Sequence, residues 1–218
     1  MCIRDRGVFG SFLQHLDEKG WFDDMYIGID ERPNMQLAFK VIQSVKNRDG
    51  KTLKISAAAN HFDGSFKEVA DQIDDLSIGT PHFKAKKDAF KRFVEDRRLK
   101  GLKTTLYTAT EEYPNSELFN QPGESYYTVL YGAKYHTNGF LRWAYDALVK
   151  NPRTDLSHWA FEAGDTQQIY PGADGTIKPE SSVRLEKLAE GIRDVNKLYQ
   201  IKATDSSLAD EVDNLLDK

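Results

Sequence analysis

The sequence is poor in cysteine, with Cys2 as the single one among 218 residues. One cysteine cannot form an internal disulfide and supplies neither a cysteine-based metal site nor thiol catalysis. Runs of about eighteen or more apolar residues are also missing, so no membrane-spanning helix is expected. The first residues lack the apolar stretch of a secretory signal, and the compartment stays open, including export of a longer protein.

Basic residues are not in excess. The chain carries 30 Lys and Arg against 34 Asp and Glu, a net charge of -4, without a dense basic stripe. Nucleic acid is therefore not an expected partner. No two histidines have an HxH or HxxxH spacing, so no metal is predicted. No glycine-rich phosphate loop follows a predicted strand, and no cofactor is expected. The five histidines are His15, His61, His82, His136 and His158.

Short β-prone segments alternate with stretches of helical periodicity, a pattern typical of parallel β-α architecture. We predict strands over 26–30, 53–59, 76–79, 103–109 and 140–145, the first of them buried on both faces. Helices are predicted around residues 38–45, 66–73, 90–94, 126–133 and 185–199 from apolar residues repeating at i, i+3, i+4 and i+7.

The predicted fold class is α/β, and a barrel is favoured over a doubly wound sheet. Five strands are fewer than the eight of a (β/α)₈ TIM barrel, and the chain starts with a helix-like stretch, 8–19. We therefore expect the C-terminal portion of a barrel, truncated at the N-terminus, with edge strands near Tyr26 and Phe140. Residues 1–6 are interpreted as a non-native start, 7–203 as a partial barrel domain, and 204–218 as a loose acidic tail.

A pair of neighbouring carboxylates, Asp30 and Glu31, follows the first predicted strand. Active sites of such folds lie at the carboxyl ends of the strands. Adjacent side chains on a regular strand point to opposite faces, so both acids can address one substrate only where the strand ends. The step from Arg32 to Pro33 provides that end. Acidic doublets are common, however, and the doublet alone identifies no function.

The surrounding sequence resembles a known family. The stretch KGWFDDMYIGIDERP (19–33) is similar to the catalytic signature of glycoside hydrolase family 123, exo-acting N-acetyl-β-galactosaminidases whose catalytic region overlaps domain of unknown function 4091. Further similar segments follow in the same order, so that the resemblance spans about 16–198. These segments are LKISAAAN (53–60), TTLYTATEEYPN (104–115), GFLRWAYD (139–146), GDTQQIYPG (164–172) and SSVRLEKLAEGIRD (181–194).

The resemblance implies substrate-assisted retaining hydrolysis of a terminal β-linked N-acetylgalactosamine or related 2-acetamido sugar, without a cofactor. The acetamido oxygen of the sugar attacks the anomeric carbon in place of an enzyme nucleophile. Asp30 would hold and polarise the acetamido N–H. Glu31 would protonate the leaving oxygen and then deprotonate water. These roles require one ionised carboxylate and one carboxyl group with a raised pKa.

Other similar positions lie late in predicted strands and loops, where substrate contacts belong. Tyr107 and Tyr145 are expected to donate hydrogen bonds, and Asn60 is a further substrate contact. Trp143 would form a wall of the acetamido pocket, with barrel packing as its alternative. Glu124 and Asp165 would either hold sugar hydroxyls or form structural ion pairs, and a structural role is favoured for Arg142.

Two alternatives to the hexosaminidase stay open. One is a non-catalytic or truncated glycan-binding module, because a fold does not guarantee chemistry. The other is a family member acting on sugars without an acetamido group. The chain by itself is expected to be inactive because strands are missing. The expected partner is a glycan, and the oligomeric state, the linkage and the choice between galacto and gluco sugars stay open.

Overall fold

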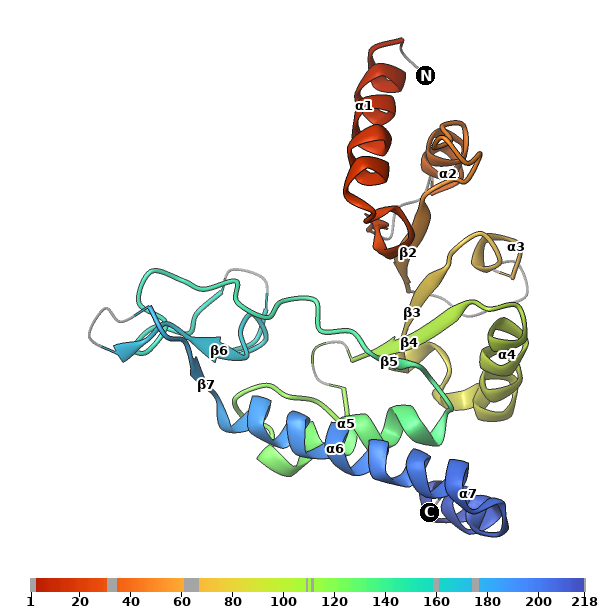
Figure 1. Ribbon diagram of the computed structural model, residues 1–218. Coiled ribbons are helices and arrows are strands. Elements are labelled where there is room, and N and C mark those ends of the chain that lie inside the picture. Colours follow the sequence, from red (N-terminus) through yellow and green to blue (C-terminus); the bar gives the residue numbers. More distant parts are fainter. Residues whose placement is uncertain are drawn as a thin grey trace. The chain divides into compact units, whose positions relative to one another are not determined.

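A computed structural model describes residues 3–30, 35–60, 67–108, 110, 112–158, 161–173 and 177–217. The chain forms two compact units (Figure 1). The first comprises Met1–Ile78 with Asp96–Thr104, and the second comprises Gly79–Glu95 with Thr105–Lys218. In the described part of the chain, no helix combines the length and the apolar character needed to cross a membrane.

Five parallel strands follow one another in chain order in one sheet, β1-β2-β3-β4-β5. They are β1 (Tyr26–Ile29), β2 (Lys54–Ala59), β3 (Asp75–Gly79), β4 (Lys103–Tyr107) and β5 (Gly139–Phe140). A strand lies at each of the five predicted places, although β4 and β5 are shorter than predicted, and the parallel α/β class is confirmed. β1 and β5 are the edges of this sheet, as expected. Closure into a barrel stays a prediction.

Register and burial explain the first three strands. β1 pairs with β2 from Tyr26↔Lys54 to Ile29↔Ala57, and β2 pairs with β3 up to Ala59↔Ile78. Every second residue of β2 is buried, whereas β3 is buried from its second residue onward. The prediction that the first strand is buried on both faces is wrong, because no residue of β1 is buried. An edge strand has a neighbour on one side only, so its side chains stay partly open.

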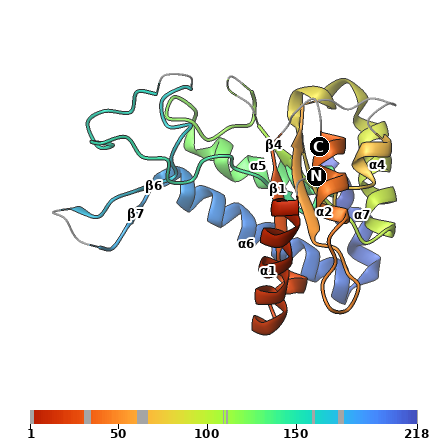
Figure 2. The same ribbon diagram turned by 90° about the horizontal axis from the view of Figure 1, so that it is seen from above.

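Helices lie where the periodicity predicted them, with α3 shorter than predicted and α1, α2, α4, α5 and α6 longer, whereas α7 was not predicted. They are α1 (Ile3–Lys19), α2 (Met35–Gln43), α3 (Lys67–Ala70), α4 (Lys87–Leu99), α5 (Pro122–Lys134), α6 (Val183–Thr204) and α7 (Ala209–Asp217). Short 3-10 turns occur at Phe22–Asp24, Thr80–His82, Lys84–Lys86 and Ser206–Leu208. A short antiparallel pair, β6 (Ile169–Tyr170) and β7 (Glu180–Ser181), forms an arm just before α6 (Figure 2).

The first unit contains a buried arginine. Arg97, 1% exposed, lies in the last turn of α4 and donates to three main-chain carbonyls, Ala70 O (2.5 Å), Ile73 O (2.8 Å) and Lys103 O (2.7 Å). Its Nε donates to Thr104 Oγ1 (2.9 Å). One side chain thus ties α3, α4 and the start of β4 together and donates to main-chain carbonyls from three segments, of which Ala70 O also accepts the N–H of Ile73. Burial lowers the pKa of Arg97 to about 10, which leaves it charged at neutral pH.

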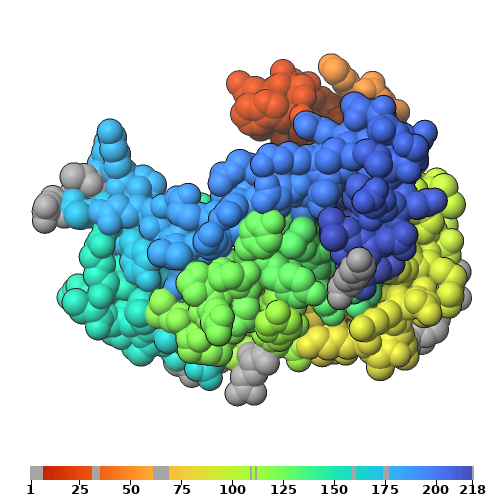
Figure 3. Space-filling view, turned by 90° about the horizontal axis from the view of Figure 1, so that it is seen from below, coloured from red at the N-terminus to blue at the C-terminus, as the bar shows by residue number. Residues whose placement is uncertain are grey.

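In the second unit, α6 lies along α5 (Figure 3). Gly191 makes this contact close, because a Cβ there would lie 2.7 Å from Tyr126 O and 3.2 Å from Val129 Cγ2. The second unit also contains an aromatic cluster. The rings of Phe83 and Phe90 stack with their centroids 3.9 Å apart, and Tyr135, the residue after α5, packs edge-on against both rings. Burial is the main cause that raises the pKa of Tyr135.

The acidic tail was expected to be loose, and this expectation is wrong. It folds into α7, which contacts α5 and α6 and buries Val212. Lys91 pairs with the Asp217 side chain (2.5 Å), and Lys202 pairs with Asp213 (2.5 Å). The tail has apolar residues on one helical face that need a neighbouring helix, a requirement that its high charge concealed.

Candidate active site

Two of the predicted site residues directly follow neighbouring strands of the first unit. Asp30 follows β1 and Asn60 follows β2, and both are exposed. Because β1 and β2 are parallel, both residues lie beyond the carboxyl ends of their strands, on the same side of the sheet. Ligands of α/β proteins bind at the carboxyl ends of the strands. Glu31, Arg32 and Pro33 lie outside the described residues. Asp30 therefore lies at the strand end where the sequence placed it, and the catalytic roles of Asp30 and Glu31 stay predictions.

Tyr107 is the last residue of β4 and lies against the end of β3, in the second unit. A Cβ built on Gly79 would come within 3.0 Å of Tyr107 Cζ and 3.1 Å of its hydroxyl oxygen. The same Cβ would lie 3.1 Å from His82 Cδ2. Gly79 therefore leaves room for the ring of Tyr107 and for His82 at the carboxyl end of the strand. No spacing or periodicity in the sequence relates these three residues.

Trp143 and Tyr145 were predicted to end the fifth strand, and this part of the prediction is wrong. β5 stops at Phe140. The following segment instead pairs in an antiparallel manner with residues 166–168. Ala147 N donates to Thr166 O (3.0 Å) and Gln168 N donates to Tyr145 O (2.8 Å). Trp143 and Tyr145 are both about half exposed. Trp143 and Tyr145 thus lie in a loop that hydrogen-bonds to the loop around residue 167. The alternation of apolar residues in the sequence does not reveal such pairing between loops.

Asp165 is buried and binds both Arg142 and Trp143. Its Oδ1 accepts a bond from Arg142 Nη2 (2.7 Å), and its Oδ2 accepts one from Trp143 Nε1 (2.6 Å). Arg142 also donates to the main-chain oxygen of Asp165. Burial lowers the pKa of Arg142, and the negative charges of Asp165 and Glu117 oppose that change. The structural ion pair was one of the two alternatives for Asp165, and the structure contains it.

An aromatic cluster surrounds Trp143. The ring of Phe161 packs on Trp143 with centroids 4.5 Å apart, and His158 lies 5.0 Å from Phe161. Trp143 keeps 49% of its surface exposed although its indole N–H is bound to a buried carboxylate. Phe161 was missed by the sequence analysis. No periodicity marks it, and only its place shortly before Gly164 and Asp165 pointed to this loop.

Glu124 stabilises the start of α5. Its Oε1 accepts from Gln121 N (3.3 Å), and its Oε2 accepts from Asn115 N (3.3 Å) and Asn120 Nδ2 (3.1 Å). The bond from Gln121 N is one half of a capping box at the start of α5, and the bonds from Asn115 and Asn120 tie the preceding loop to the helix. The contacts favour the structural alternative for Glu124. Its role in holding sugar hydroxyls stays a prediction.

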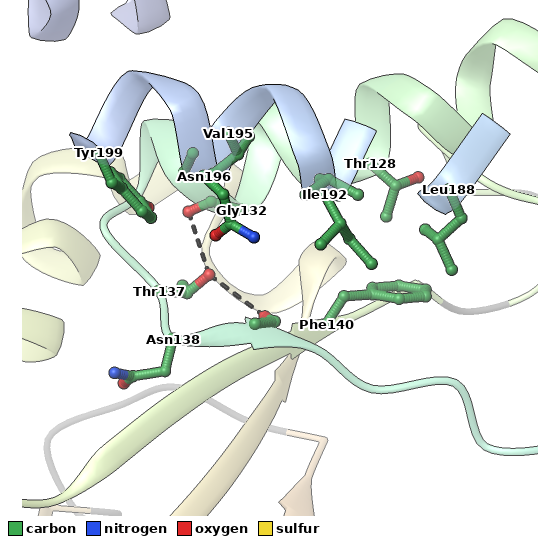
Figure 4. A pocket seen from close by; sticks show the side chains of 13 residues that line it. Thr128, Gly132, Thr137, Asn138, Phe140, Leu188, Ile192, Val195, Asn196 and Tyr199 are labelled. Atoms are coloured by element: carbon green, nitrogen blue, oxygen red, sulfur yellow. Dashed lines mark hydrogen bonds between the residues drawn. The ribbon is translucent and has the colours of Figure 1, made fainter. Parts of the chain in front are cut away.

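A pocket of about 340 Å³ lies elsewhere in the second unit, between α5, α6 and β5 (Figure 4). Phe140, Leu188 and Ile192 give it an apolar wall, and Thr137 bonds to the carbonyls of Gly132 (3.0 Å) and Gly139 (3.3 Å). None of the predicted site residues lines it. Among the residues that the structure describes, no cluster of three or more potential metal ligands occurs.

Comparison with known families adds the decisive observation. The model of the glycoside hydrolase 123 catalytic domain matches residues 7–201, most of the chain. The chain belongs to glycoside hydrolase family 123. The resemblance found in the sequence is thereby confirmed. The matched region includes Asp30, Glu31 and each of the predicted substrate residues.

A solved structure supports the same assignment. The chain resembles a family 123 glycoside hydrolase from Clostridium perfringens, studied for the details of glycolipid glycan hydrolysis, with a TM-score of 0.89 and 39% identity. The match covers 98% of this chain and 37% of that protein. The chain thus spans little more than a third of the length of this relative. No protein with a curated description matches it.

Proposed function

We propose that the full-length protein is a glycosidase that removes terminal β-linked N-acetylgalactosamine, or a related 2-acetamido sugar, from glycans. The position of Asp30 carries this proposal. In this family 123 catalytic domain the carboxylate follows β1 at the carboxyl end of the parallel sheet, and Asn60 follows the neighbouring strand β2. The glycolipid glycans studied with the Clostridium relative make glycolipids a candidate source of the sugar.

In the proposed reaction, the carbonyl oxygen of the sugar's acetamido group attacks the anomeric carbon while the glycosidic bond breaks. Asp30 accepts the acetamido N–H and stabilises the positive charge of the oxazolinium that forms. Glu31 donates a proton to the departing oxygen. Glu31 then takes a proton from water, which attacks the anomeric carbon and opens the oxazolinium ring with net retention of configuration.

The remaining residues act on the sugar by polar and aromatic contacts. Asn60 and Tyr107 end strands and offer an amide and a phenol to sugar oxygens. Trp143 and Tyr145 present half-exposed rings, which suit the C–H face of a sugar or the acetamido methyl group. No metal or cofactor enters this scheme, since two carboxyl groups and the acetamido group account for every bond and proton.

A thiazoline derived from N-acetylgalactosamine, a mimic of the oxazolinium, tests the proposal. We expect it to inhibit the full-length protein competitively. In Asp30→Asn, inhibition should weaken by at least tenfold, because a neutral amide cannot stabilise the cationic ring. Thermal melting should stay near the wild-type value, since Asp30 is exposed. Unchanged thiazoline affinity with lost activity would show that Asp30 does not contact the acetamido group.

The same experiment separates the alternatives. A glycan-binding module without turnover would bind sugar and hydrolyse no aryl glycoside. A family member that acts on sugars without an acetamido group would hydrolyse glycosides of those sugars and would not be inhibited by the thiazoline. Either result would replace the hexosaminidase proposal.

A further inference from the structure

Asp165 lies too deep to serve as an ordinary sugar-binding carboxylate. It is 3% exposed, and each of its oxygens already accepts a short hydrogen bond, one from Arg142 and one from Trp143. Each oxygen could accept a second bond, but at this burial a sugar hydroxyl reaches neither of them without displacing Arg142 or Trp143. Displacement would leave a buried polar group unpaired, which costs about 1–3 kcal/mol. Asp165 therefore acts on neighbouring protein groups.

Trp143 is the neighbour through which Asp165 can reach a ligand. Its indole edge is tied to the buried carboxylate, whereas nearly half of its surface remains open. Phe161 packs on the indole at a tilt of 44°, so two contacts of different kinds set the orientation of the ring. An exposed tryptophan without such contacts would rotate and would lose conformational entropy on binding a ligand.

Arg142 holds Asp165 in turn. It binds the side chain and the main-chain oxygen of the same residue, and it is itself buried. The backbone beside Asp165 is packed closely as well. Gly164 has φ +85°, and a Cβ built on it would lie 2.7 Å from Leu118 Cγ, so no larger residue fits there. The acceptor for the indole N–H is therefore in place before a ligand arrives.

We propose that Asp165 is a positioning residue, which holds the Trp143 indole so that its exposed face packs against the bound 2-acetamido sugar. This proposal rests on the proposed function. Asp165 then acts on the sugar through its hydrogen bond to Trp143 and does not bind a sugar hydroxyl itself. Asp165 and Trp143 together increase substrate affinity more than they accelerate the chemical step. Without this hydrogen bond the indole must be ordered when the sugar binds. That cost falls equally on the ground-state and transition-state complexes, so loss of the bond raises KM and leaves kcat nearly unchanged.

The test uses the full-length protein and an aryl N-acetyl-β-galactosaminide. Asp165→Asn should raise KM by roughly fivefold or more, the equivalent of one hydrogen bond, with a much smaller change in kcat. In a Trp143→Phe background, which lacks the indole N–H, the same substitution should change KM by less than about twofold. Equal effects in both backgrounds would show that Asp165 acts without Trp143 and would overturn the proposal.

A second variant does not disturb Asp165 at all. Incorporation of 3-benzothienylalanine in place of Trp143 keeps the shape of the ring and the Arg142–Asp165 pair, and removes only the N–H donor. This replacement should raise KM by the same factor that is expected for Asp165→Asn. It therefore tests the proposal independently if Asp165→Asn fails to fold. An unchanged KM would overturn the proposal. Asp194→Asn is the matched control, because Asp194 also joins an aromatic donor, Tyr126, to a cation, Lys197, and should leave KM unaltered.

Fluorine NMR of protein labelled with 5-fluorotryptophan separates this proposal from the proposed function, because it needs no substrate. The resonance lost in Trp143→Phe identifies Trp143. In Asp165→Asn this resonance should shift and broaden, whereas a resonance at its wild-type position would overturn the positioning role. If the resonance shifts but the wild-type protein neither binds the thiazoline nor hydrolyses acetamido sugars, the proposed function has failed and the assignment of a sugar to Trp143 falls with it.

Discussion

At the residue scale, the proposed roles of Asp30 and Glu31 predict different responses to the leaving group of the substrate. A general acid matters most when the leaving oxygen is basic. In the full-length protein, Glu31→Gln should therefore reduce kcat for an alkyl or sugar leaving group by at least 10²-fold, and reduce it far less for a nitrophenyl glycoside. Steady-state kinetics with a series of aryl leaving groups measures this dependence.

Asp30→Asn is the internal comparison for this series. Its loss of activity should be similar for all leaving groups, because Asp30 is proposed to act on the acetamido group and not on the departing oxygen. Equal losses for good and poor leaving groups in Glu31→Gln would contradict the acid role of Glu31.

Arg97 determines stability and takes no part in the proposed chemistry. Arg97→Met would remove the Arg97 donor from the carbonyls of Ala70, Ile73 and Lys103, of which Ala70 O keeps the N–H of Ile73, and the free energy of unfolding should fall by about 3 kcal/mol. Arg92→Met, an exposed change on the same helix, should alter it by less than about 0.5 kcal/mol. Chemical denaturation of the full-length protein measures both differences.

The destabilisation caused by Arg97→Met should be the same at pH 5.5 and pH 8. The folded-state pKa of Arg97, about 10, lies well below the ordinary value of an arginine. The unfolded state therefore binds more protons only between these two values, and stability rises with pH only in that window. A difference that varies between pH 5.5 and 8 would show that another titrating group depends on Arg97.

At the scale of elements, the contact between α5 and α6 depends on one missing side chain. Gly191→Ala adds a methyl group 2.7 Å from Tyr126 O, so the helices must separate, and we expect a loss of about 1–3 kcal/mol in stability. Gly10→Ala on α1 adds the same methyl group with nothing within 4 Å. It should stabilise the helix by up to about 1 kcal/mol through propensity alone. Thermal melting of both variants checks the opposite signs.

Helix propensity favours alanine at both positions, so it cannot explain opposite results. If Gly191→Ala stabilised the protein as well, the close approach of the two helices would not be a structural requirement.

At the scale of the whole molecule, the proposed mechanism restricts the substrate class. The nucleophile belongs to the sugar, and a well-placed intramolecular nucleophile contributes several kcal/mol to the rate. An aryl β-galactoside lacks this group. We expect its kcat/KM in the full-length protein to be at least about 10³-fold below that of the matching N-acetyl-β-galactosaminide. A parallel assay of the two substrates measures the ratio, and comparable values would exclude substrate assistance.

The sequence by itself determined the local features of this protein and the family to which it belongs. Burial patterns repeat every two residues in strands and at three to four residues in helices, so β2 and α6 were visible in the order of apolar side chains. The doublet at Asp30 and the resemblance around it located the candidate site, since a short segment at a strand end carries its chemistry in adjacent residues.

Only the tertiary structure decided which distant groups meet. The hydrogen bonds of Arg97, the close approach at Gly191 and the carboxylate behind Trp143 join residues that no periodicity relates. The end of β5 and the packing of α7 depend on partners from other parts of the chain, and such partners override local preference. Hydrogen bonds and steric contacts act over a few ångströms in space, whatever the separation along the chain, and a pattern of neighbours in sequence cannot reveal them.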